Sequence, residues 1–85
     1  MAENLNNLVF KNFEDVSTSV SKYRGITSDN KIVTISFIEG SCDIGVGENN
    51  IEALRNRAEA FYLPQNGDYI SRGELFERMG WAMES

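Results

Sequence analysis

The residues best suited to do chemistry in this chain are a group of carboxylates in its middle. Residues 39–52 carry Glu39, Asp43, Glu48 and Glu52 without any basic residue, and Glu59 follows shortly after. Carboxylates can act as general acids and bases or hold a hard cation such as calcium. Their spacing does not match an EF-hand loop, and we expect Glu52 and Glu59 to lie on the solvent-facing side of a helix. The sequence therefore predicts neither a metal site nor a carboxylate catalyst.

Other catalytic side chains are scarce. The chain has no histidine, which removes the commonest general base and the commonest metal ligand. Cys42 is the only cysteine, so it has no disulfide partner and no histidine to activate it, and we expect a small, partly buried side chain. Gly45-Val46-Gly47 lacks the lysine of a phosphate-binding loop and is typical of a strand end and turn. We therefore expect no enzyme activity and no cofactor.

The charge of the chain favours a particular kind of partner. The net charge is −5, from 8 basic and 13 acidic residues. Direct binding to nucleic acid normally needs a clustered basic surface, so we do not expect it. A basic protein surface would be attracted instead. Two accounts of the acidic stretch stay open: it favours the dipole at a helix start, or it forms a negative surface for a partner.

Trp81 is the second candidate for partner binding. Helical geometry places it well away from the core stripe of the last helix, among charged residues. An exposed tryptophan beside an arginine is typical of an interface hot spot. The alternative is that Trp81 packs on the N-terminal helix or on the sheet. The predicted partner-binding residues are thus Glu39, Asp43, Glu48, Glu52, Glu59 and Trp81.

The carboxylates and Trp81 must be positioned by secondary-structure elements. The first of these is a predicted helix over residues 4–14. The signal is a series of apolar residues at helical spacing in and just after this range, namely Leu5, Leu8, Val9, Phe13 and Val16. A strand is the alternative. Tyr23 to Thr27 and Lys31 to Glu39 then flank the turn-forming Ser28-Asp29-Asn30, which predicts a β-hairpin that pairs Tyr23 with Ile35. A short third strand over residues 41–46 would complete a small antiparallel sheet with one apolar face.

Two helices are predicted to follow. The first, from about residue 50 to residue 62, is capped by Asn49 or Asn50, and its apolar stripe consists of Ile51, Leu54, Ala58, Phe61 and Tyr62. The second begins with the capping box of Ser71 and Glu74. Its core stripe consists of Leu75, Phe76, Met79 and Met83. The expected fold class is therefore α+β, in which a small antiparallel sheet packs against helices in the order α-β-β-β-α-α, as a single domain over residues 1–85.

This size, acidity and expected element order resemble small phage-encoded inhibitors of the anti-CRISPR type. The resemblance implies a stoichiometric inhibitor that blocks a host nucleic-acid-processing protein and has no chemistry of its own. The alternatives are an antitoxin or immunity protein that neutralises a toxin, and a homo-oligomeric structural protein such as a homodimer paired through an open sheet edge. The single cysteine and the lack of a long apolar stretch favour the cytoplasm and no membrane anchor.

Overall fold

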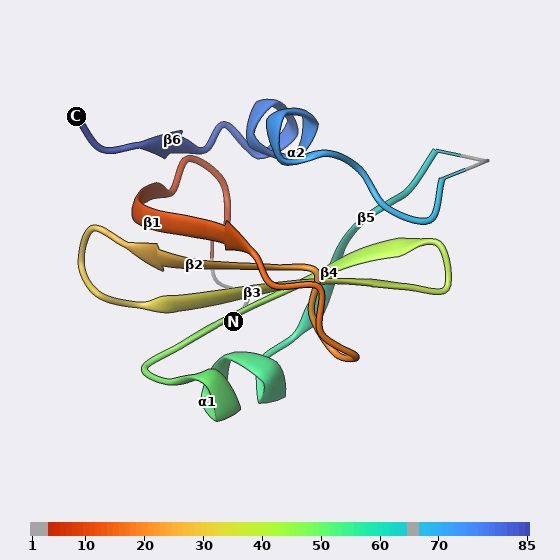
Figure 1. Ribbon diagram of the computed structural model, residues 1–85, viewed down its shortest axis with the longest axis horizontal. Helices are drawn as coiled ribbons and strands as arrows, with labels where there is room; N and C mark the ends of the chain where they lie inside the picture. Colours follow the sequence, from red (N-terminus) through yellow and green to blue (C-terminus); the bar gives the residue numbers. More distant parts are fainter. Residues whose placement is uncertain (1–3, 65–66) are drawn as a thin grey trace.

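The computed structural model describes residues 4–64 and 67–85 and consists mainly of one curled sheet (Figure 1). In chain order the elements are β1 (Val9–Asp15), β2 (Tyr23–Thr27), β3 (Ile32–Ile38), β4 (Ser41–Gly47), α1 (Asn50–Arg55), β5 (Ala58–Tyr62), α2 (Arg72–Met79) and β6 (Ala82–Met83). The strand order across the sheet is β5-β4-β3-β2-β1-β6. All neighbours are antiparallel except β1 and β6, which are parallel. The predicted fold class is therefore wrong, because a six-stranded mixed sheet with two short helices replaces a three-stranded sheet packed against helices.

The two helices lie on opposite sides of the sheet, as Figure 1 shows. Helix α2 covers the concave face, where the hydrophobic core lies, and α1 covers part of the convex face. The fully buried members of the core are large apolar side chains and one cysteine from three strands and α2: Phe10, Val33, Ile35, Cys42, Ile44 and Leu75. Both faces are therefore partly covered, whereas the alternating pattern of the hairpin predicted packing on one face only.

The predicted helix over residues 4–14 is wrong, and the alternative of a strand is correct for residues 9–15. The register between β1 and β2 shifts between Phe10 and Asn12, which marks a β-bulge. An extra residue changes the alternation of a strand, so Phe10 and Phe13 both face the core although they are three residues apart. Gly25 makes this possible, because a Cβ atom there would lie 2.6 Å from the Phe10 ring and 2.8 Å from the Phe13 ring. The spacing that suggested a helix belongs to a bulged strand.

The hairpin and the third strand are confirmed. Tyr23 lies opposite Ile35, as predicted, and residues 41–47 pair with β3 in antiparallel register. Tyr23, Val33 and Ile35 face the core, and Phe37 packs against it. The turn between β2 and β3 is closed by hydrogen bonds, including one from the Asn30 amide to the Thr27 carbonyl oxygen at 2.9 Å.

The predicted helix over residues 50–62 is wrong after residue 55. Asn49 caps α1 as predicted, but the helix ends at Arg55 and the chain continues as β5. The predicted stripe does not face the core as a unit, since Ile51 is 64% exposed and Tyr62 is 71% exposed, whereas Phe61 packs against the core. Instead, α1 rests on Gly45 and Gly47 through Ala53, and β5 supplies β4 with a hydrogen-bonded neighbour. Satisfying the backbone groups of β4 outweighs the continuation of the helix.

Helix α2 begins as predicted, because the Ser71 side chain accepts a hydrogen bond from the Glu74 amide at 3.2 Å. Leu75 and Met79 are buried and Phe76 packs against the core. Met83 is 41% exposed, so its place in the predicted stripe is wrong. The helix has already ended at Gly80, whose φ of 68° is left-handed, and Met83 belongs to β6.

Candidate functional site

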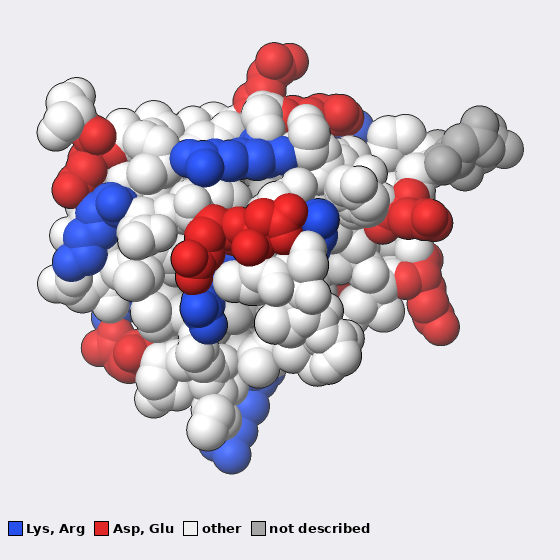
Figure 2. All heavy atoms as spheres, viewed as in Figure 1, with Lys and Arg blue, Asp and Glu red and all other residues white. Residues whose placement is uncertain are grey.

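The acidic residues do not form one continuous surface. Three ion pairs form among the described residues, namely Lys22 with Asp15, Arg24 with Glu14 and Lys31 with Glu48. On the face seen in Figure 2, acidic and basic side chains are interspersed. Glu39 precedes β4 and Glu48 follows it, so these two carboxylates lie at opposite ends of a seven-residue strand, which is roughly 20 Å long.

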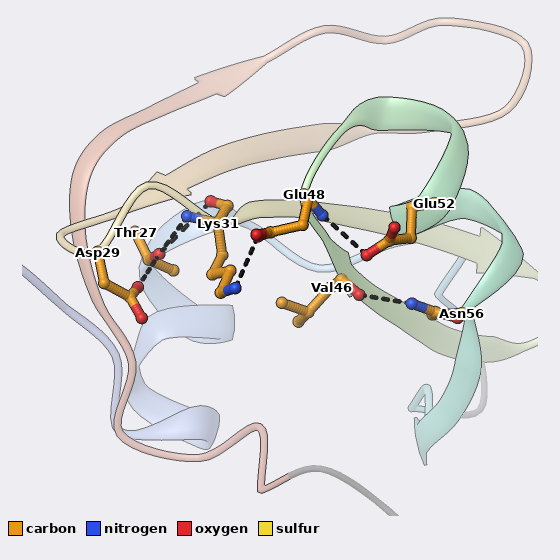
Figure 3. Close-up of polar contacts among 7 residues, drawn as sticks. All are labelled: Thr27, Asp29, Lys31, Val46, Glu48, Glu52 and Asn56. Carbon is orange, nitrogen blue, oxygen red and sulfur yellow. Dashed lines mark hydrogen bonds and ion pairs between the residues drawn. The ribbon is translucent and has the colours of Figure 1, made fainter.

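Glu48 and Glu52 hold α1 against the sheet (Figure 3). The Glu48 carboxylate lies 2.6 Å from the Lys31 ammonium, and this hydrogen bond raises the pKa of Lys31. The Glu52 carboxylate accepts a hydrogen bond from the Glu48 amide at 3.0 Å, while the Glu52 amide donates to the Asn49 side chain at 2.9 Å. At the other end of the helix, the Asn56 side chain donates to the Val46 carbonyl oxygen at 2.8 Å. Both acids therefore have bonds within the protein, and Glu52 lies in the first turn of α1, where the helix-start account placed it.

Asp43, Glu59 and Glu39 lie at the other end of the convex face, and we call them the acidic rim. Asp43 on β4 and Glu59 on β5 are directly opposite each other in the register. Two like charges in such a position destabilise a sheet. Neither carboxylate belongs to an ion pair within the described residues; Asp43 accepts a hydrogen bond from the Ser41 hydroxyl at 2.7 Å. The prediction that Glu59 shares a helix with Glu52 is wrong, but the fold brings Glu59 to Asp43.

Trp81 lies in the core and is only 5% exposed. Gly80 turns the chain after α2, and the Trp81 amide donates to the Phe76 carbonyl oxygen at 2.9 Å. The indole N–H donates to the carbonyl oxygen of Leu5 at 2.7 Å. The ring packs against Phe10 at a centroid distance of 4.9 Å. The second account of Trp81, packing inside the protein, is the one that the structure supports.

A groove of about 500 Å³ opens beside the acidic rim. It lies where β2 begins and β3 ends, and it is lined by residues 17–22, by residues 36–38 and by Arg57, Asp68 and Tyr69. The Ser36 hydroxyl in its wall donates to the Val20 carbonyl oxygen at 2.6 Å, and Arg57 donates to the same oxygen at 3.5 Å. The loop over residues 17–21 is therefore fastened to the convex face.

Exposed apolar side chains gather around this groove. Val20, Ile38 and Tyr69 line it and are 51%, 38% and 55% exposed. Tyr62 lies in one row with Ile38, because both are paired with Ser41 across β4. We call Val20, Ile38, Tyr62 and Tyr69 the tyrosine surface. Four of the seven large, exposed hydrophobic residues in the described part of the chain thus belong to one region.

The acidic rim borders the tyrosine surface on two sides. Glu39 follows Ile38 directly, and the Asp43–Glu59 pair lies in one row with Ser36 of the groove wall. The aromatic and aliphatic groups can bury area against a partner, and the carboxylates can meet basic groups around them.

Cys42 is the nucleophilic side chain that the sequence offers, and it lies in the core. Burial raises the pKa of the Cys42 thiol to about 12, and its side chain is fully buried, so the nucleophilic thiolate is strongly disfavoured. In the part of the chain that the structure describes, no three His, Cys, Asp or Glu side chains lie where they could hold a metal ion together.

Sequence reasoning missed the tyrosine surface. Tyr62 was assigned to a buried helical stripe, and Val20, Ile38 and Tyr69 carry no motif. The only signal was that large apolar residues stood beside turn-forming ones, as Ile38 does before Glu39-Gly40 and Tyr69 does after Gly67-Asp68. That signal does not show that these residues come together.

Comparison with known proteins adds no relative: no family model, curated protein or solved structure matches this chain. Within the described ranges, no helix has both the length and the apolar character needed to cross a membrane. The resemblance to small phage inhibitors rested partly on element order, and that order is not the one found.

Proposed function

We propose that this protein is a non-enzymatic protein-binding inhibitor whose partner presents a basic surface. The observation that carries the proposal is the gathering of exposed apolar residues beside carboxylates that have no ion-pair partner within the described part of the chain. Aromatic side chains such as Tyr62 and Tyr69 are enriched at protein interfaces. The acids at the border would steer a basic partner and fix its orientation.

Basic surfaces of this kind are characteristic of proteins that bind nucleic acid. The proposed target is therefore a nucleic-acid-processing protein, whose phosphate-binding groups would be covered by the acidic rim. An antitoxin or immunity protein acting on a nuclease would use the same physical contacts, and the identity of the captured protein would distinguish the two.

The test is capture from nuclease-treated bacterial lysate on the immobilised protein, at low and at high salt. Three baits are compared: the native chain, the rim variant Asp43→Asn with Glu59→Gln, and the control variant Glu74→Gln with Glu77→Gln. The control removes the same charge from exposed positions on α2. We expect the native and control baits to retain one host protein in stoichiometric amount. The rim variant should bind it about tenfold more weakly, which corresponds to about 1.4 kcal/mol.

Salt should weaken the same complex, because screening reduces the attraction between exposed charges. Equal capture by the rim variant and the native chain would refute a role for the acidic rim. If the native chain retained only itself and ran as a multiple of 9.6 kDa, the homo-oligomeric alternative would replace the inhibitor.

A further inference from the structure

The two edge strands of the sheet differ in length, since β6 has two residues and β5 has five. At one edge, β6 pairs with β1, and the chain around it donates two more backbone hydrogen bonds, from Ala82 to Leu8 at 3.1 Å and from Glu84 to Phe10 at 2.8 Å. At the other edge lies β5, which pairs only with β4, and no described segment pairs with its outer side (Figure 1). An open edge strand offers unpaired backbone groups to another chain.

The geometry of β5 shows which backbone groups are offered. The Leu63 amide donates to the Gly40 carbonyl oxygen at 2.8 Å, so it points toward β4. Because these groups alternate along a strand, the Tyr62 N–H and C=O point outward. Ala60 is the extra residue of a bulge, since Phe61 pairs with Cys42 and Glu59 with Asp43. A bulge twists an edge, so an added strand would form only a few hydrogen bonds, and side chains must supply much of the affinity.

The side chains near this edge define the partner. On the convex side, Glu59 and Asp43 lie next to each other, with Glu39 at the nearby turn and Arg57 as the basic residue at the start of β5. On the concave side, the Phe61 ring lies beneath the Arg78 guanidinium at 4.6 Å. An added strand would therefore place lysine or arginine on its convex side and apolar residues on its concave side.

We infer that β5 accepts an extended, basic segment of the partner protein as a seventh strand of the sheet. This inference rests on the proposed function and deepens it, because it names how the partner binds. A second copy of this chain is a poorer occupant. Pairing of two β5 strands would bring together two edges that each carry the adjacent Glu59 and Asp43 carboxylates, and like charges across a strand pair are destabilising.

The test distinguishes the contribution of the outward Tyr62 N–H group to binding from that of the Tyr62 ring. Tyr62→Ala removes the ring, and Tyr62→Pro removes the ring together with the outward donor, which an edge strand tolerates. The probe is a short synthetic peptide of alternating lysine and valine, and the control peptide alternates glutamate and valine. Binding is followed through the amide NMR shifts of the isotopically labelled protein. Thermal melting of both variants shows whether each is folded.

We expect saturable shifts of residues 57–63 with the lysine peptide. The glutamate peptide should bind about tenfold more weakly, and Tyr62→Pro should lower affinity about tenfold below Tyr62→Ala. Absence of saturable shifts in β5, or equal binding of both peptides, overturns the inference. The inference is also overturned if the free native chain is a dimer, with a mass of twice 9.6 kDa. If Tyr62→Pro does not fold, the native chain with the two peptides still decides the question.

The outcomes also separate this inference from the proposed function. Should the rim variant lose the captured host protein while Tyr62→Pro and Tyr62→Ala retain it equally, strand addition is wrong and the inhibitor proposal stands. Should the rim variant retain the protein, the proposed function itself fails.

Discussion

The two faces of the curled sheet are built from different kinds of side chain. The concave face is aromatic: the Phe10 ring lies 5.2 Å from Phe13 and 4.9 Å from Trp81 between centroids. The convex face has Gly45 and Gly47 under α1, and a side chain at Gly45 would collide with the helix backbone. The concave face therefore supplies most of the buried apolar area, while the convex face has space for close approach and for polar groups.

The convex face is itself divided. At the end of the convex face that α1 covers, the carboxylates of Glu48 and Glu52 accept hydrogen bonds from other groups of the protein. Beside the groove wall, Asp43 and Glu59 lie opposite each other, and neither belongs to an ion pair of the described residues. Residues of one chemical type thus have different roles, depending on which end of β4 they occupy. With the proposed function, this difference predicts that stability and recognition can be altered separately, and the following substitutions test this.

The largest expected effect is that of Trp81→Ala on the concave face. Truncating a buried tryptophan costs about 3–5 kcal/mol of unfolding free energy, because both packing and the indole hydrogen bond to Leu5 are lost. The measurement is urea unfolding followed by circular dichroism. Trp81→Phe is the control, since it keeps a ring and removes the N–H donor, and it should cost less. An unchanged midpoint for Trp81→Ala would mean that the ring is not core.

Gly45→Ala should have the next largest effect, on the convex face. The new Cβ atom would lie 1.8 Å from the Ala53 carbonyl oxygen, so α1 must move away from the sheet. We expect a loss of about 3 kcal/mol in unfolding free energy. Gly73→Ala is the matched control, because its Cβ atom meets nothing within 4 Å. Inside α2, alanine should stabilise the protein by about 0.5 kcal/mol. Equal effects of the two substitutions would contradict the close packing of α1.

The parts of the fold that the sequence predicts are those decided locally. The hairpin of β2 and β3 has alternating side chains and a turn-forming loop, and Ser71 with Glu74 marks the start of α2. The regions that were mispredicted are decided by tertiary contacts. The bulge in β1 produces a three-residue spacing that imitates a helix, and residues 58–62 become a strand because β4 needs a neighbour.

The candidate site was predicted only in part, for a related reason. Glu39 and Glu48 are close in the sequence, but β4 carries them to opposite ends of the sheet. Glu59 is distant from Asp43 in the sequence, and strand pairing brings them together. Helical geometry placed Trp81 outside the core, yet the helix ends at Gly80 and that geometry does not apply. Charge composition predicts the type of partner, whereas the location of its contact depends on the fold.

Thr34→Val should stabilise the protein by a smaller amount. The Thr34 side chain is buried on the convex face, and its hydroxyl has no hydrogen-bond partner within the described residues. Valine has nearly the same shape without the unpaired group, so the unfolding free energy should rise by about 1 kcal/mol. Ser36→Ala is the opposite case, because it removes the hydrogen bond to the Val20 carbonyl oxygen and should cost about 1 kcal/mol. A loss of stability in Thr34→Val would show that its hydroxyl is bonded in solution.

The smallest expected effects are those of substituting the acids at the two ends of the convex face. Asp43→Asn with Glu59→Gln relieves a like-charge pair, so the unfolding free energy should rise by about 0.5 kcal/mol. Glu48→Gln with Glu52→Gln weakens the bonds that hold α1, so the melting temperature should fall slightly. Capture of the host protein should change the other way. The variant Asp43→Asn with Glu59→Gln should lose the host protein, and the variant Glu48→Gln with Glu52→Gln should retain it. If both variants changed stability and capture in the same direction, the two ends of the convex face would not have separate roles, and the acids would act only through the net charge of the chain.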